Sequence, residues 1–362
     1  MLIFFTSLAG HGHVRPLAPL ALAAREAGHQ IVFGTGKRFR GLVEGLGFEF
    51  LPVGDEGDQD ESPDDERVQL AVRAFGWRLP VRFIADLVPV FGEIDPDLVV
   101  YEAAALGAGI AARLAGVPGV CHGFGRGTVP DERAIRPFVA YAGRFGVDLS
   151  GVALGERYLD IYPESLQDEG FLALVRRQPL RPVALPSMGD VPRWLSESGP
   201  PIVYLTLGTV FGDARVFRDT LIGLGGLGVR VLVAFGAGVE RAELGPLPES
   251  VDARPWINQA AVLPQADLIV HHGGSGTALG ALAAGVPQLF LPQGADQFVN
   301  AKHISAAGAG RQLLGDVVTA EDVRSGAGEL LASQDAQEAA YTIAAEIAQM
   351  PSPYEVVREI FS

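Results

Sequence analysis

The sequence is poor in cysteine and in basic residues, and it has no long apolar run. Its single cysteine, Cys121, excludes an intrachain disulfide and a zinc site built from several cysteines. Lysine and arginine number 28 against 43 aspartates and glutamates, a net charge of −15, so no nucleic-acid partner is expected. No apolar run reaches the ~20 residues of a membrane span, and the start of the chain has no signal-peptide pattern. We therefore expect a cytoplasmic protein with no membrane partner.

What the sequence does have is a repeated alternation of strand and helix patterns. Its 362 residues, 48% hydrophobic and 20% charged, suggest two globular domains. Apolar strand patterns such as 1–7, 29–36 and 97–102 alternate with helical ones, and a second such series starts near 202. This alternation predicts an α/β fold with two doubly wound, Rossmann-like domains whose parallel sheets face a cleft. The expected domains are residues 1–182 and 201–345, with an interdomain linker at 183–200 and a closing helix at 346–362 that packs back towards the N-terminal domain.

The stretch HHGGSGT at residues 271–277 follows a buried strand pattern and precedes a helical one. Glycines let the backbone approach a ligand, and a helix that begins at Ser275 presents free N–H groups and the positive end of its dipole. Ser275 and Thr277 add hydroxyl groups, and His272 adds an imidazole. Together these features indicate a diphosphate site, with a tight strand–helix turn as the structural alternative.

A similar join follows the strand pattern that begins the second series. The sequence TLGTV at 206–210 places Gly208 and Thr209 directly after that strand. Because the carboxyl ends of parallel strands share one edge of a sheet, both residues are expected to face the same phosphate.

The first strand is followed by GHGHVRP at residues 10–16, which is not a dinucleotide-binding GxGxxG fingerprint. It places His11 and His13 in a loop at the carboxyl end of that strand. Histidine is the usual general base near neutral pH, and a carboxylate partner would orient it. Glu102 ends the strand DLVVYE at the same edge and is the candidate partner.

These motifs together resemble the inverting, nucleotide-sugar-dependent glycosyltransferases of the GT-B fold, the family of plant UDP-glycosyltransferases and bacterial macrolide and antibiotic glycosyltransferases. The resemblance covers essentially the whole chain and is strongest over residues 256–297, WINQAAVLPQADLIVHHGGSGTALGALAAGVPQLFLPQGADQ. It implies an acceptor-binding N-terminal domain and a donor-binding C-terminal domain. It also implies a catalytic pair formed by His13 and Glu102, although the family often has aspartate in place of this glutamate.

The resemblance also assigns the donor site. Trp256 would stack on the nucleobase with Ile257 and Gln259 beside it, and His272 would contact the diphosphate while His271 packs. Asp296 and Gln297 would read sugar hydroxyls. The implied donor-binding positions are Gly208, Thr209, Trp256, Ile257, Gln259, His272, Gly274, Ser275, Gly276, Thr277, Asp296 and Gln297.

One departure from the family pattern concerns the donor. UDP-sugar enzymes usually have a glutamate for the ribose hydroxyls three residues after the position of Thr277, where this chain has Gly280. The lack of a carboxylate fits a 2′-deoxyribose and predicts a dTDP-sugar, with a UDP-sugar as the other candidate donor. Alternatively, Gly280 is a helix-packing position.

The expected activity is transfer of a deoxysugar to a hydrophobic acceptor such as a polyketide, macrolide or related aglycone, with no cofactor and no metal ion. The acceptor walls are expected to be aromatic. They are assigned to Phe75, Trp77, Phe83, Phe91 and residues 122–127. Two alternatives stay open: a nucleotide-sugar 2-epimerase of the same architecture, and an inactive helper or binding protein on this scaffold. The sequence leaves the oligomeric state open, a homodimer included.

Overall fold

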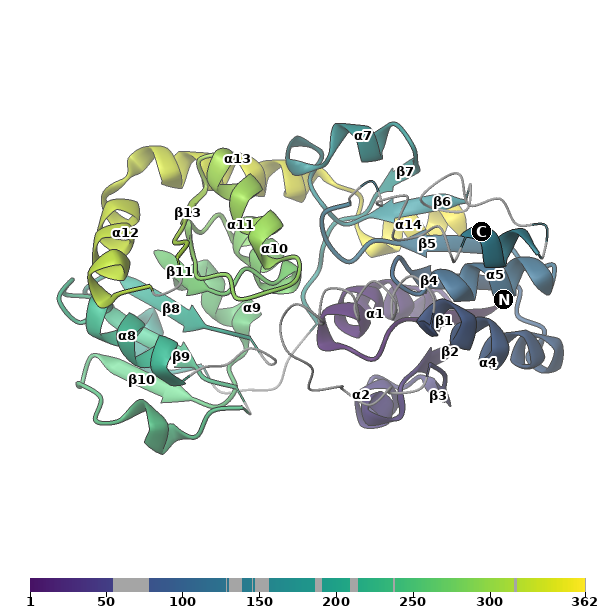
Figure 1. Ribbon diagram of the computed structural model, residues 1–362, viewed down its shortest axis with the longest axis horizontal. Coiled ribbons are helices and arrows are strands. Elements are labelled where there is room, and N and C mark those ends of the chain that lie inside the picture. Colours follow the sequence, from purple (N-terminus) through teal and green to yellow (C-terminus); the bar gives the residue numbers. More distant parts are fainter. Residues whose placement is uncertain are drawn as a thin grey trace. The chain divides into compact units, whose positions relative to one another are not determined.

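The computed structural model describes residues 1–54, 78–127, 129, 139–144, 146, 156–185, 191–208, 214–236, 238–315 and 318–361. The chain divides into two compact units (Figure 1). The first comprises Met1–Arg181 and Met350–Ser362, and the second comprises Pro182–Gln349. The expected Phe75, Trp77 and Thr209 lie outside the described residues.

The first unit is built on a parallel sheet with the strand order β3-β2-β1-β4-β5-β6-β7. Most of the central strands are buried on both faces, which is why they read as continuous apolar runs in the sequence. The strands are β1 Leu2–Thr6, β2 Gln30–Thr35, β3 Glu49–Pro52, β4 Leu98–Glu102, β5 Gly119–His122, β6 Arg157–Asp160 and β7 Arg176–Pro179.

Helices flank this sheet, and one of them comes from the end of the chain. Helices α4 and α5 pack over the sheet face that carries Phe4, Val99 and Tyr101. The closing helix α14 packs against α1, as Figure 1 shows, and Tyr354 of α14 donates a hydrogen bond to Glu26 of α1. The helices are α1 His11–Glu26, α2 Arg40–Gly45, α4 Leu79–Ile94, α5 Leu106–Leu114, α7 Glu169–Leu172 and α14 Pro353–Ile360, with 3-10 turns η1 Lys37–Phe39 and η3 Glu164–Leu166.

The second unit repeats this plan with the strand order β10-β9-β8-β11-β12-β13, again all parallel. Helices α8 and α12 bury one face of the sheet, and α9, α10 and η4 bury the other. The strands are β8 Ile202–Thr206, β9 Arg230–Ala234, β10 Val251–Arg254, β11 Leu268–His271, β12 Gln288–Phe290 and β13 Gly310–Gln312. The helices are α8 Ala214–Leu224, α9 Gln259–Val262, α10 Ser275–Ala284, α11 Gln297–Ala306, α12 Ala320–Ala332 and α13 Gln334–Gln349, with 3-10 turns η4 Arg193–Ser196, η5 Arg241–Leu244 and η6 Leu263–Gln265.

The predicted fold class is confirmed, since both units are α/β with parallel sheets. Three differences are local. Strands β6, β7 and β13 were not predicted. Part of the expected linker is ordered on the second unit, where Leu195 is buried in the core and Arg230 donates to the carbonyl oxygen of Trp194. The expected acceptor-wall residues Phe83 and Phe91 are core residues, 1% and 2% exposed, and Phe91 packs edge-on against Phe4. Across the described residues, no helix has both the length and the apolar character to cross a membrane.

Candidate active site

Both sheets have a topological switch point, the place where the strand order reverses direction. It lies between β1 and β4 in the first unit and between β8 and β11 in the second. Loops after such strands are where ligands of open α/β sheets usually bind. Most of the residues expected to act on substrates follow these four strands and the neighbouring β12, whereas Trp256, Ile257 and Gln259 follow the edge strand β10. The topology places them in two groups, one in each unit.

In the first unit, the histidines of GHGHVRP lie in a helix, which corrects the loop expected from the sequence. Helix α1 begins at His11, so His13 is in its first turn, and Gly10 is an N-cap without a side-chain hydrogen bond. The prolines at 16 and 19 lie inside the helix. Pro16 lacks the N–H group that would bond the Gly12 carbonyl, so the helix forms without that hydrogen bond.

The helix start brings His13 to Glu102. The Nδ1 atom of His13 lies 3.1 Å from Oε2 of Glu102, which is at ion-pair distance. The Glu102 side chain is 1% exposed, and its Oε1 accepts a 2.7 Å hydrogen bond from the N–H of Ala104. The glutamate side chain therefore reaches the imidazole despite its extra methylene group. His11 points elsewhere, with its ring edge-on to Phe39.

Two further residues surround this pair. The ring of Phe124, in the loop after β5, lies 4.9 Å from the His13 ring at an angle of 48°. His122 ends β5 in register with Glu102 and is fully buried. Burial lowers the pKa of His122 to about 4, so it is neutral near pH 7.

In the second unit, His272 is held between two glycines. A Cβ atom added at Gly208 would lie 2.7 Å from the imidazole, and one added at Gly274 would lie 2.5 Å from its Nε2. Only glycine leaves room for the ring here, and Gly208 also has a φ of +79°, which favours glycine. Burial lowers the pKa of His272 to about 4, although Asp296 attracts its charged form. It can therefore serve a ligand as a neutral hydrogen-bonding group.

The neighbouring His271 packs inside the protein, as expected. It is fully buried, its Nδ1 accepts from the N–H of Gly273, and its Nε2 is 2.9 Å from Oε1 of Gln288. Because the backbone N–H must be the donor, the proton of His271 sits on Nε2. Gln288 in turn donates to the carbonyl oxygen of Ala278, which ties the histidine to helix α10.

Helix α10 begins at Ser275 after Gly274, and no side chain caps it. Its first N–H groups, including those of Ser275 and Gly276, therefore face outward with the positive end of the dipole. Thr277 is half-buried in the same turn. Uncapped helix starts of this kind can bind anions, and the diphosphate site at this position stays a prediction.

The Ser275 hydroxyl was expected to contribute to a phosphate site, but in the structure it bonds another side chain of the protein. It donates a 2.6 Å hydrogen bond to Oδ2 of Asp296, and the same oxygen accepts from Nδ2 of Asn300 at 3.0 Å. Asn300 also bonds the Gly273 carbonyl, and it is a site residue that sequence reasoning missed. Its position four residues after Asp296 on helix α11 was the available signal.

The remaining donor positions divide into exposed and buried ones. Trp256 is 43% exposed, whereas Ile257 is 4% exposed and packs into the core rather than beside a ligand. Gln297 is also buried, and its Oε1 accepts from the N–H groups of Gln293 and Gly294, so only its amide nitrogen remains for a sugar. Ala295, just before Asp296, has a φ of +54°, a strained value of the kind that gathers at functional sites.

Gly280 faces Gln259 across the start of α9. A Cβ atom at Gly280 would lie 2.9 Å from Nε2 of Gln259 and 3.2 Å from Cδ1 of Leu263. The Gln259 amide thus occupies the space beside Gly280. Within the described part of the chain, no three histidine, cysteine or acidic side chains gather as a metal site would require.

Comparison with known proteins assigns the chain to a family. Residues 218–362 match the family model described as Erythromycin biosynthesis protein CIII-like, C-terminal domain. The chain is 35% identical over 328 residues to the L-demethylnoviosyl transferase of Streptomyces niveus, covering 86% of this chain and 85% of that protein.

Solved structures agree. The calicheamicin glycosyltransferase CalG4 has the same fold, with a TM-score of 0.86 at 24% identity over 99% of this chain and 97% of that one. The glycosyltransferase SsfS6 of Streptomyces sp. SF2575, complexed with thymidine diphosphate, has a TM-score of 0.78 at 26% identity over 100% and 99% of the two chains. The protein is a glycosyltransferase and belongs to the GT-B family of macrolide and antibiotic glycosyltransferases.

Proposed function

We propose that the protein transfers a deoxysugar from a dTDP-sugar to a hydroxyl group of an apolar natural product, with inversion at the anomeric carbon. The observation that carries this proposal is the contact between His13 and the buried Glu102. A carboxylate on Nδ1 leaves Nε2 as the nitrogen that takes a proton, and it stabilises the imidazolium that forms.

The reaction is a single displacement. His13 takes the proton of the acceptor hydroxyl as the oxygen forms its bond to the anomeric carbon. The bond from that carbon to the diphosphate oxygen breaks, and the nucleoside diphosphate leaves with the electron pair. Attack from the face opposite the leaving group inverts the configuration.

The second unit supports the departure of the diphosphate. Negative charge grows on the leaving oxygen, and the uncapped start of α10 offers N–H groups and a helix dipole for it. His272 adds a hydrogen bond without adding a charge, since burial keeps it neutral. Donors fixed in place before the reaction stabilise a developing charge most effectively.

Two observations support a dTDP-sugar as the donor. Gly280 has no carboxylate to bind a ribose 2′-hydroxyl, and the Gln259 amide fills the space beside it. SsfS6, which is similar over its whole length, is described as complexed with thymidine diphosphate. For the acceptor, Phe124 beside His13 provides an aromatic surface, as a flat apolar substrate requires.

Calorimetry with dTDP and UDP tests the donor proposal directly. We expect tighter binding of dTDP, and a loss of dTDP binding in His272→Ala. Initial rates with dTDP-glucose and UDP-glucose, and 4-methylumbelliferone as a phenolic acceptor, then compare turnover. A clear preference for UDP in both measurements would rule out the dTDP proposal and leave the glycosyltransferase assignment in place.

A further inference from the structure

The loop after β5 carries the aromatic ring that packs on His13. It begins where the N–H of Gly123 donates to the carbonyl oxygen of Leu159, and Phe124 follows. The Phe124 ring, 4.9 Å from the His13 ring, limits how the imidazole can turn. The imidazole of His13 thus has two contacts that limit its orientation, the Glu102 carboxylate at 3.1 Å and the Phe124 ring.

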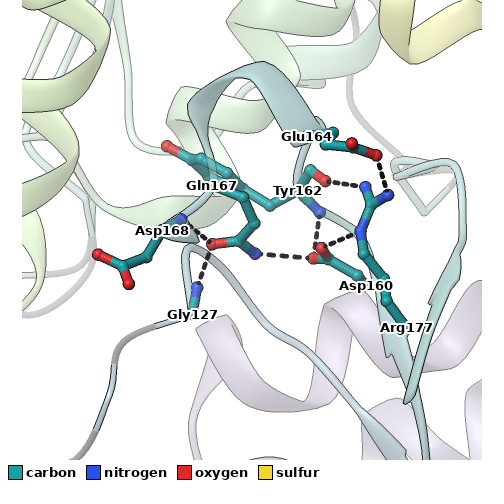
Figure 2. A network of polar contacts seen from close by, with 7 residues as sticks. All are labelled: Gly127, Asp160, Tyr162, Glu164, Gln167, Asp168 and Arg177. Carbon is teal, nitrogen blue, oxygen red and sulfur yellow. Dashed lines mark hydrogen bonds and ion pairs between the residues drawn. The ribbon is translucent and has the colours of Figure 1, made fainter. Parts of the chain in front are cut away.

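Three hydrogen bonds tie this loop to the segment that follows β6. Oε1 of Gln167 accepts from the N–H of Gly127 at 2.9 Å. The guanidinium of Arg126 donates to the carbonyl oxygen of Leu166 at 3.0 Å and to Oδ2 of Asp168 at 3.2 Å. Figure 2 shows the Gln167 side chain lying between Gly127 and Asp160. The end of the loop is therefore fixed from several directions.

The segment after β6 is itself anchored on Asp160, a fully buried carboxylate at the end of that strand. Asp160 accepts from the N–H of Tyr162 and from Nε2 of Gln167, both at 3.0 Å, and from Nε of Arg177 at 2.8 Å (Figure 2). Burial raises the pKa of this carboxyl group above its usual value, and Arg177 opposes that effect. A buried carboxylate is costly unless its oxygens are well bonded, and here they are.

We infer that Gln167, anchored by Asp160, is a positioning residue that holds Phe124 against the imidazole of His13. The inference rests on the proposed role of His13 as the base, and it goes further by naming what orients that base. Gln167 can hold the loop because its amide links two segments. The amide nitrogen donates to the carboxylate of Asp160, and the amide oxygen accepts from the N–H of Gly127. Small misplacements of a catalytic group cost up to ~10²-fold in rate.

The test compares Gln167→Met with two other variants. Methionine keeps the length of the side chain and removes the three hydrogen bonds of the amide, with Gly127, Asp160 and Asp168. Phe124→Leu leaves the hydrogen bonds in place and removes the ring. Glu164→Gln is the matched control, since Glu164 is 67% exposed and accepts a hydrogen bond from Nη1 of Arg177 rather than from Gln167. The readout is the NMR signal of the His13 ring Cε1–H, assigned by its loss in His13→Ala and followed as pH varies.

We expect Gln167→Met and Phe124→Leu to shift and broaden the His13 signal and Glu164→Gln to leave it unchanged. Turnover of dTDP-glucose with 4-methylumbelliferone should fall about tenfold in kcat in the first two variants, with KM for the donor unchanged. In a His13→Ala background, Gln167→Met should cause no further fall. If Gln167→Met does not fold, Gln167→Asn carries the same expectations, because it keeps the amide but is one methylene too short to bond both Asp160 and Gly127.

The two proposals fail in different ways. Full turnover in His13→Ala would refute the proposed base, whatever Gln167 does. A His13 signal unmoved by Gln167→Met and by Phe124→Leu, with His13→Ala inactive, would overturn the positioning role and keep the base. An equal fall caused by Gln167→Met with and without His13 would assign Gln167 a structural role only.

Discussion

Nδ1 of His13 faces Oε2 of Glu102 at 3.1 Å, although the two residues are 89 positions apart in the sequence and start from different elements. His13 lies in the first turn of the helix after β1, and Glu102 ends β4, the strand paired with β1. The switch in strand order is what makes these two chain segments neighbours.

The first prediction concerns this pair. His13→Ala should lower kcat by ~10²–10⁴, the usual contribution of a general base. Glu102→Gln keeps the shape and removes the charge that stabilises the imidazolium, so kcat should also fall, by a smaller factor. Steady-state rates with 4-methylumbelliferone measure both. The affinity for dTDP should stay unchanged, because the residues proposed to bind the nucleotide belong to the other unit.

The matched control for this prediction is Glu44→Gln. Glu44 bonds Arg40 on the exposed surface of α2, where an ion pair contributes little. Wild-type turnover in both His13→Ala and Glu102→Gln would contradict the catalytic assignment.

The second prediction concerns the room around His272. Gly274→Ala adds a methyl group 2.5 Å from Nε2 and must displace the ring. The loss of a hydrogen bond to a charged ligand is worth ~1.5–3 kcal/mol, so dTDP affinity should fall by about 10- to 100-fold. Calorimetry measures it. Gly328→Ala, in helix α12 with only an ordinary contact to Leu227, should bind dTDP like the wild type.

The third prediction concerns donor selectivity at Gly280. Gly280→Glu supplies the missing carboxylate and should move the ratio of dTDP to UDP affinity towards UDP, by about tenfold if a ribose hydroxyl is bonded. The Gln259 amide must move aside, which the free end of a side chain can do. Gly280→Gln adds the same bulk without the charge. If both variants change the ratio equally, packing rather than the carboxylate is responsible.

The fourth prediction concerns stability and pH. Burial lowers the pKa of His122 to about 4 and that of His271 to about 3, whereas an unfolded histidine titrates near 6.5. Below pH ~6.5 the unfolded chain binds protons that the folded chain excludes. The free energy of unfolding should therefore fall as pH drops through this range, by up to ~1.4 kcal/mol per pH unit for each histidine, and not change above it on their account.

Urea unfolding at pH 7.5 and pH 5 checks this dependence. In His122→Gln the loss between the two pH values should be smaller than in the wild type by about 2 kcal/mol. An unchanged loss would mean that His122 takes up its proton as readily in the folded state as in the unfolded one.

The sequence predicted the parts of this molecule that follow from local patterns. The central strands are apolar runs bounded by glycines and polar residues, so β1, β4, β8 and β11 were readable, and with them the edge at which ligand-binding residues would lie. Strands β6, β7 and β13, with the sequences RYLD, RRQP and GRQ, carry charged residues and are held by neighbouring strands rather than by their own pattern.

Side-chain contacts between residues far apart in the sequence could not be predicted either. Nothing local to Ser275 shows that its hydroxyl is taken by Asp296, 21 residues later, or that Gln297 uses its oxygen to hold the turn before it. Ile257, Phe83 and Phe91 look from the sequence like ligand-facing residues, because aromatic and aliphatic side chains serve cores and binding sites alike.

The packing of α14 against α1 has a consequence for building chimeric enzymes. The chain leaves the first unit after Arg181 and returns to it at Met350, and the N–H of Arg181 donates to the carbonyl oxygen of Pro351 where the two passages meet. The second unit is thus an insertion into the first, with its entry and exit side by side. To exchange the proposed donor-binding unit between relatives, the graft should run from 182 to 349 and leave the last helix with its original partner.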